Sequence, residues 1–236
     1  MAKMAVKRLN LDEIGEVCFY KRRGTRSIHI YIRGNEIHVT LPYWVTYNRA
    51  IDFAYTKKDW IIKNRKPKAI FSDGCRIGKT HTLQVETNNE TKTVSCRVTE
   101  SCIKVKLPSK RSHYENFIQQ KINNAADRAL LKQSRILLKQ RIDDLSFEHD
   151  IEYKSVKFKK LRGRWGSCDN YGNVTLNIYL IQLPWYLIDY VIVHELAHTI
   201  HHNHSQQFWQ LVADILPDYK QTKKEIKQFH PHIIVS

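Results

Sequence analysis

The segment YLIDYVIVHELAH, residues 186–198, is the most informative part of the chain. Its apolar run indicates a buried helix, and this helix carries His194 and His198 four residues apart. Because an α-helix advances by about 100° per residue, the two side chains project from one face, about one turn apart. Two imidazoles placed in this way can bind one metal ion at about 2.0–2.1 Å. Glu195 lies beside the first of them, where a carboxylate can accept a proton from a metal-activated water.

A third ligand is expected in the turn that follows this helix. Catalytic zinc usually takes three protein ligands and leaves the fourth position to water or substrate. His204 follows His198 by six residues, so the helix has to end and the chain has to turn back. Asn203 suits such a turn because asparagine tolerates the left-handed conformation, and Ser205 can cap a new helix over residues 206–213. We therefore predict one zinc ion bound by His194, His198 and His204.

Two other zinc-site patterns fit this sequence less well. Enzymes with HExxHxxGxxH continue into a methionine turn. Here His201 occupies the glycine position, and the only methionines are Met1 and Met4. Thermolysin-like enzymes take a glutamate as third ligand. Glu225 is the only glutamate after Glu195, and we rank it below His204.

The sequence upstream of the helix forms a second group of motifs. Residues 164–168 read RWGSC, and the next five residues are rich in Asp, Asn and Gly, which favour tight turns. Alternation over residues 156–158 and 174–176 predicts two strands that pair as a hairpin. We expect Asn177 to bond to backbone groups, and Cys168 to pack rather than to bind metal.

With these motifs the chain resembles the YgjP-like metallopeptidase family, which is related to the SprT-like zinc proteases. The resemblance rests on RWGSC, a strand ending in LN, PxxxxDYVIVHELAH and NHSxxFW, in this order between about Tyr153 and Pro217. It implies a minimal zincin fold, in which a small sheet packs on the HExxH helix. It also implies zinc bound by His194, His198 and His204, with Glu195 as the general base.

This chemistry predicts a zinc-dependent hydrolase, and a peptidase acting on polypeptides is our first hypothesis. A hydrolase of nucleotides or other phosphate compounds would use the same site, and a zinc-binding module without turnover would have no use for Glu195. Peptide hydrolysis also needs a group that stabilises the developing oxyanion. The candidates by residue type are Arg164, Tyr179, Tyr190 and His201. The adjacent histidines His201 and His202 could face the substrate or support the zinc ligands, but we prefer the interpretation that they form a solvated helix end.

The chain is strongly basic, with a formal net charge of +16. A basic patch without acidic residues precedes RWGSC and includes Lys157, Lys159, Lys160 and Arg162. Such a patch can attract an anionic substrate or nucleic acid, and an ordinary solvated surface is the other interpretation. No zinc-finger or helix-turn-helix pattern accompanies it.

Length and periodicity predict an α+β protein with two domains. A mainly β N-terminal domain with one helix is expected over residues 1–110, and a helical connector with the zincin-like domain over residues 111–236. Strands are expected within residues 14–41, 81–86, 92–98 and 102–107, and helices over residues 48–64 and 112–143. Turns are expected at Arg23-Gly24 and Arg33-Gly34-Asn35, and regular structure is expected to be interrupted at Pro67 and at Ser72-Asp73-Gly74.

The remaining composition concerns the cellular compartment. The five cysteines are odd in number and form no CxxC pair, which indicates reduced thiols. No apolar run is long enough for a membrane span, and the first residues lack a secretory apolar core, so we expect a cytoplasmic protein. No sequence feature indicates an oligomeric state.

Overall fold

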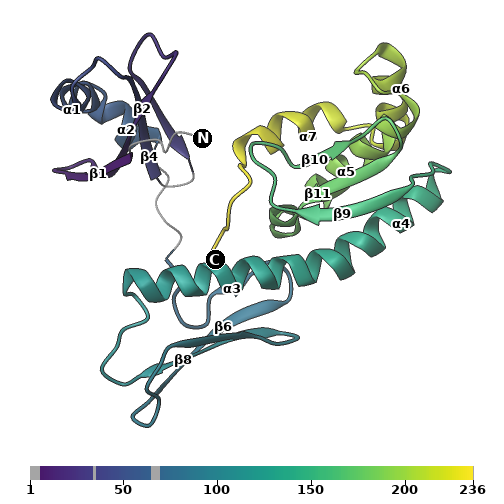
Figure 1. Ribbon diagram of the computed structural model, residues 1–236. Coiled ribbons are helices and arrows are strands. Elements are labelled where there is room, and N and C mark those ends of the chain that lie inside the picture. The colour runs from purple at the N-terminus through teal and green to yellow at the C-terminus, as the bar shows by residue number, and fades with distance from the viewer. Residues whose placement is uncertain (1–5, 34–35, 65–69, 236) are drawn as a thin grey trace. The chain divides into compact units, whose positions relative to one another are not determined.

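The computed structural model describes residues 6–33, 36–64 and 70–235 (Figure 1). The chain divides into two compact units, Met1–Lys68 and Ala69–Ser236. The boundary that we expected near residue 110 lies inside the second unit, between strand β8 (Cys102–Pro108) and helix α3 (Asn116–Gln133). The reason is that α3 packs on the sheet containing β8, so both share one hydrophobic core. Gly34-Asn35 of one expected turn, and the interruption expected at Pro67, lie outside the described residues.

The N-terminal unit is a four-stranded sheet with two helices on one face. Its strand order is β1-β2-β4-β3, with the bounds β1 (Val6–Leu11), β2 (Gly15–Arg22), β3 (His29–Arg33) and β4 (Glu36–Pro42). Helices α1 (Tyr47–Thr56) and α2 (Lys58–Asn64) bury Ala50, Ala54 and Ile61 against the apolar side chains of this sheet. The single helix expected over residues 48–64 is thus two helices that meet at Lys57, and strand β1 precedes the expected strand region.

The second unit begins with another four-stranded sheet and a long helix. The sheet order is β5-β6-β8-β7, with the bounds β5 (Arg76–Ile77), β6 (His81–Asn88), β7 (Ser95–Val98) and the β8 already given. Helix α3 buries Ile118, Ile122 and Ala129 in the core that it shares with this sheet. It continues through a π-helical turn (Ser134–Leu138) into α4 (Lys139–Glu148), so that one long helical segment runs through the unit (Figure 1).

A small three-stranded sheet follows, and its pairing corrects one prediction. The order is β10-β11-β9, with the bounds β9 (Ser155–Lys159), β10 (Gly166–Cys168) and β11 (Asn173–Asn177). The hairpin joins β10 to β11, whereas β9 lies parallel to β11. The expected hairpin between residues 156–158 and 174–176 was therefore wrong. The tight turn lies after β10 instead, where the Asp169 carboxylate accepts hydrogen bonds from the backbone N–H groups of Tyr171 and Asn173.

Helix α5 (Trp185–Ile200) is the centre of the C-terminal part. It contacts β10, β11, α4, α6 (Gln206–Ile215) and α7 (Tyr219–Glu225), and the short helices η2 (Ile178–Gln182) and η3 (Ile226–Gln228) complete this region. Its buried residues extend around most of its circumference, as in a helix enclosed by other elements. A small sheet packed on a central helix confirms the expected α+β class. No helix in the described part of the chain is long and apolar enough to cross a membrane.

Candidate metal centre

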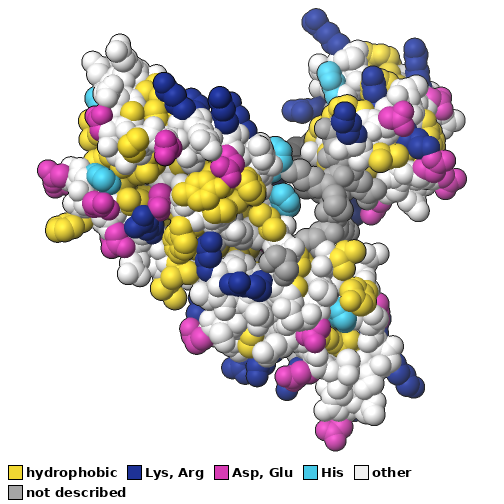
Figure 2. Space-filling model, turned by 180° about the vertical axis from the view of Figure 1, so that it is seen from behind, with side chains coloured by type: hydrophobic (Ala, Val, Ile, Leu, Met, Phe, Trp, Pro, Cys, Tyr) yellow, Lys and Arg dark blue, Asp and Glu magenta, His cyan; other side chains and the backbone are white. Residues whose placement is uncertain are grey.

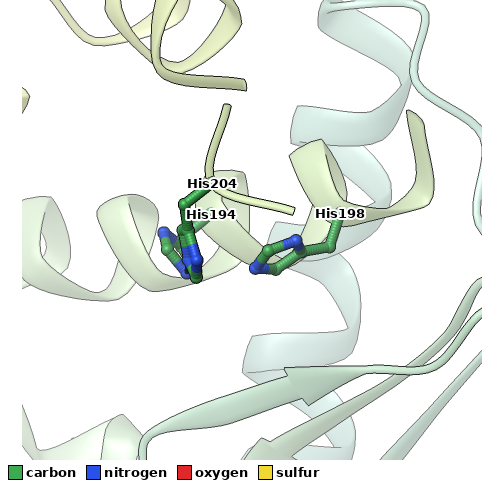
Figure 3. A group of neighbouring side chains, drawn as sticks. All are labelled: His194, His198 and His204. Carbon is green, nitrogen blue, oxygen red and sulfur yellow. Dashed lines mark hydrogen bonds between the residues drawn. The ribbon is translucent and has the colours of Figure 1, made fainter. Parts of the chain in front are cut away.

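Three histidine side chains converge at the end of α5 (Figure 3). His194 and His198 lie one turn apart on α5, and His204 reaches back from the turn that precedes α6. One ring nitrogen from each lies within 4.8 Å of the other two. The Nε2 atoms of His194 and His204 are 3.1 Å apart, close to the roughly 3.3 Å that separates two nitrogens on a tetrahedral zinc ion. Among the described residues, no other group of three His, Cys, Asp or Glu side chains is placed to hold a metal ion.

The turn between α5 and α6 brings His204 to this position. His201 ends α5 in an extended conformation, with its N–H still bonded to the carbonyl of Ala197. Ser205 begins α6 by accepting a hydrogen bond from the N–H of Phe208, as predicted from its capping position. Asn203 does not adopt the left-handed conformation, so that part of the prediction was wrong. The chain reverses through extended backbone at both helix ends.

The surroundings of the histidines favour neutral imidazoles with fixed orientations. Nδ1 of His198 donates a hydrogen bond to the carbonyl of His201 at 3.1 Å, which leaves Nε2 with a free electron pair. The buried ring of Phe208 lies 4.6–5.0 Å from all three imidazoles. Burial, together with the neighbouring histidines, lowers the pKa of His194 to about 3, and burial also lowers the pKa of His198. Neutral imidazole is the form that binds a metal ion.

Glu195 is buried beside these histidines, and its side chain packs against Gly166 of strand β10. Burial raises the pKa of its carboxyl group to about 8, against the opposing charge of Arg164. Gly166 approaches it so closely that a β-carbon at this position would lie 2.5 Å from Oε1. A side chain at residue 166 would therefore displace the carboxylate, which explains the glycine in RWGSC.

A pocket of about 350 Å³ opens over this group. Helix α5 and the following turn form one wall, and RWGSC with the turn after it forms the other. His202, for which a solvated helix end had been preferred to a substrate-facing position, lines this pocket, and so do Ser167 and Asn170, which were not among the predicted site residues. The position of Ser167 in the RWGSC motif could have indicated that it lies in the pocket. Asn170 indicated only a turn.

Only one of the four oxyanion candidates lines the pocket, and it is Arg164. The hydroxyl of Tyr179 donates instead to the carboxylate of Asp127 at 2.9 Å. Tyr190 is buried in the core, where desolvation raises its pKa to about 12. The side chain of His201 is not among those lining the pocket.

The basic patch before RWGSC does not line the pocket either. Lys157 and Lys159 are exposed on β9, and Arg162 is exposed in the loop that follows. Lys160 forms an ion pair with Asp127, the residue that also accepts from Tyr179. Its charge is therefore already balanced within the fold.

Three further residues that the sequence singled out, Asn177, Cys168 and Glu225, do not bind the metal ion in this arrangement. Asn177 holds the RWGSC loop, because its side-chain NH₂ donates to the carbonyls of Leu161 and Arg164, both at 2.9 Å. Cys168 lines the pocket, but burial and the charge of Glu195 raise its pKa to about 11, so it remains a thiol. All five cysteines are free, as predicted. Glu225, the alternative third ligand, accepts a hydrogen bond from the hydroxyl of Tyr186 and is not part of the histidine group.

The sequence model of the family described as "YgjP-like, metallopeptidase domain" matches residues 26–229, a range that extends across both units. The chain belongs to the YgjP-like metallopeptidase family. This confirms the resemblance seen in the motifs. At the level of the family, the protein is a metallopeptidase, and membership implies a divalent metal ion, typically zinc.

Two solved structures are similar to part of this YgjP-like protein. The metallopeptidase zymogen abylysin of Pyrococcus abyssi is 21% identical and covers 39% of this chain and 93% of its own, with a TM-score of 0.37. The metallopeptidase zymogen jannalysin of Methanocaldococcus jannaschii is 21% identical and covers 38% of this chain and 93% of its own, with a TM-score of 0.35. No curated protein matches the chain significantly.

Proposed function

We propose that this protein is a zinc-dependent peptidase of the HExxH type, which binds one zinc ion through His194, His198 and His204. The observation that carries the proposal is the convergence of three imidazole nitrogens within 4.8 Å of one another, beside a buried carboxylate in an open pocket. When bound there, zinc would polarise the scissile carbonyl and lower the pKa of a water molecule toward 7.

The residues around the histidines supply the other functions of a peptidase. We assign to Glu195 the function of general base. Burial disfavours its ionised form, but the positive charge of a bound zinc ion would favour it. The carboxylate then accepts a proton from the attacking water and passes it to the nitrogen of the leaving amine. The close approach of Gly166 restricts where this carboxylate can lie. Arg164 lines the same pocket, and we assign to it the stabilisation of negative charge on the carbonyl oxygen.

A phosphate-hydrolysing enzyme could use the same three ligands. Such an enzyme holds an anionic substrate next to its metal ion, and cationic side chains there would strengthen the binding of the phosphate group. Arg164 is the only Lys or Arg among the residues that line this pocket, since Lys157, Lys159, Lys160 and Arg162 are absent from it. This favours a polypeptide as substrate.

The proposal is tested by comparing Glu195→Gln with Glu225→Gln. Both changes replace a carboxyl group by an amide, but Glu225 bonds to Tyr186 outside the pocket. Zinc-loaded proteins are incubated with a fluorescently labelled unfolded protein and, separately, with nucleoside triphosphates. We expect the wild type and Glu225→Gln to cleave the polypeptide, and Glu195→Gln to be about 10²–10⁴-fold slower with its zinc retained.

Two results would overturn the proposal. Full proteolytic activity in Glu195→Gln would remove the assigned base. Hydrolysis of the triphosphates without any cleavage of polypeptide would replace the peptidase by the phosphate-hydrolysing enzyme.

A further inference from the structure

The N-terminal unit carries a second pocket, of about 620 Å³, which we call the Arg22 pocket. The side chains that matter here are Arg22, Arg23, Arg26, His29, Tyr31 and Thr40. No Asp or Glu lines it. It lies in a different unit from the histidine group and has a different chemical character.

The arginines come from the end of β2 and from the turn that leads to β3. Val17 and Phe19 belong to the core under α1 and α2, so strand alternation places Tyr20 and Arg22 on the opposite face of the sheet. Gly24 makes the turn possible with a positive φ of 79°. Arg22, Arg23 and Arg26 are all exposed, and none forms an ion pair with another described residue. Three guanidinium groups therefore line one pocket, and no carboxylate of the described residues forms an ion pair with them.

An aromatic stack on the same face adjoins these arginines. Register pairs His38 with Tyr31 on the neighbouring strand, and their rings stack at 5.1 Å with an angle of 8°. Tyr20 stacks on His38 at 5.4 Å, and its hydroxyl lies 3.0 Å from the His38 Nδ1 atom. Although His38 covers one side of it, Tyr31 is still 42% exposed. The stack holds the Tyr31 ring in a fixed orientation at the pocket.

The N-terminal unit as a whole is also strongly basic. Residues 1–68 contain fifteen Lys and Arg against six Asp and Glu, a net +9 of the chain's +16. Figure 2 shows Lys and Arg side chains projecting from the surface of this unit. A positive field of this kind draws polyanions toward the surface before any specific contact forms.

We propose that the Arg22 pocket binds single-stranded nucleic acid. The planar guanidinium group of arginine can donate two parallel hydrogen bonds to the oxygens of a phosphate group. The three arginines therefore bind the phosphodiester backbone. The exposed ring of Tyr31 stacks on an unpaired base, and His29 and Thr40 supply further polar contacts. A duplex keeps its base faces inside the helix and offers none to Tyr31. An acidic peptide would satisfy the arginines but has no base to stack on the ring.

The test measures binding of fluorescent 20-nucleotide oligo(U), oligo(dT) and a duplex of equal length by anisotropy, with the full-length, zinc-loaded chain. The triple variant Arg22→Ala/Arg23→Ala/Arg26→Ala is compared with Lys157→Ala/Lys159→Ala/Arg162→Ala, which loses the same charge elsewhere. We expect the wild type to prefer the single strands, the pocket variant to bind them at least about tenfold more weakly, and the control variant to change little. The slope of log K against log salt should fall by about 2 in the pocket variant.

A second pair of variants separates stacking from charge. Tyr31→Ala should weaken binding of single strands by about 5- to 150-fold, whereas Tyr31→Phe should keep it. Circular dichroism establishes that each variant is folded, and this pair tests the proposal even if the triple variant is not. The ratio of oligo(U) to oligo(dT) affinity tells which polymer is preferred.

Four results would overturn the proposal: equal losses in the two triple variants, equal affinity for the duplex, competition by poly-glutamate as effective as by the oligonucleotides, or no binding by the wild type. None of them bears on the histidine group, because all variants leave residues 194–204 unchanged.

Discussion

Gly166 and Glu195 approach each other so closely that a β-carbon on the glycine would lie 2.5 Å from the carboxylate Oε1. The glycine lies on β10 and the glutamate on α5, almost thirty residues later in the sequence. The two motifs RWGSC and HELAH thus meet at one point, where the strand encloses the proposed base. This contact gives the glycine of RWGSC a function that the hairpin turn alone does not require.

Gly166→Ala is the direct probe of this contact. The added methyl group has to displace the Glu195 side chain, while His194, His198 and His204 are left in place. We expect proteolytic activity to fall by at least about tenfold with zinc content unchanged, and the free energy of unfolding to fall by about 1–3 kcal/mol from overpacking. Steady-state kinetics, zinc analysis and urea unfolding measure the three quantities. A folded alanine variant with wild-type activity would contradict the role given to this contact.

The ion pair between Arg141 and Asp189 is expected to stabilise the helix that carries the histidines. Arg141 on α4 donates to both carboxylate oxygens of Asp189 on α5, at 2.6 and 2.8 Å, and the aspartate side chain is only 14% exposed. Because the arginine is 34% exposed, we expect Asp189→Asn to lower the free energy of unfolding by about 1–2 kcal/mol, less than for a fully buried pair. Urea unfolding at neutral pH measures this change.

The pair Lys106–Glu86 provides the matched control for that experiment. Its atoms are 3.4 Å apart, and both side chains are about half exposed. Glu86→Gln, which also replaces a carboxylate by an amide, should change the free energy of unfolding by less than about 0.5 kcal/mol. Equal effects of the two substitutions would show that the Arg141–Asp189 pair contributes no more to the free energy of unfolding than an exposed ion pair does.

His81 predicts a pH dependence of stability that is separate from the metal centre. Its buried ring donates from Nε2 to the carbonyl of Thr99 and lies 2.9 Å from the Thr80 hydroxyl, and burial lowers its pKa from the ordinary 6.5. The unfolded chain therefore takes up a proton at His81 more readily than the folded chain. The stability from neutral His81 is present above pH 6.5 and is lost as the pH falls below it.

His81→Gln isolates this contribution from the other histidines. Between pH 7.5 and 5.5, the variant should lose less unfolding free energy than the wild type, by up to about 1.4 kcal/mol. Urea unfolding at the two pH values measures the difference. Identical losses in both proteins would show that the pKa of His81 is the same in the folded and unfolded chains.

The sequence predicted the histidine group well because its spacing is local. His194 and His198 follow from helical periodicity, and Ser205 caps α6 as its residue type indicates. Contacts between distant segments were not accessible in this way. Tyr179 bonds to Asp127, 52 residues away, and β9 pairs in parallel with β11 although a hairpin was expected.

Contacts between distant segments also determine where the domain boundary lies and which residues line the pocket, so neither could be predicted from the sequence. The strand pattern that ends at Pro108 suggested the end of a domain, but α3 buries Ile118 and Ile122 in the core that it shares with this sheet. Residue type alone made Arg164 and Tyr179 equal candidates for the oxyanion. Only the fold shows that the arginine lines the pocket while the tyrosine does not.

We propose that His204 completes a zinc site with His194 and His198. Elemental analysis after dialysis measures the zinc content per chain in the wild type, in His204→Ala and in His201→Ala. The last variant removes a neighbouring imidazole that does not line the pocket and leaves its backbone carbonyl in place. We predict about one zinc ion per chain in the wild type and in His201→Ala, and little or none in His204→Ala. A full complement of zinc in His204→Ala would show that His204 is not a zinc ligand.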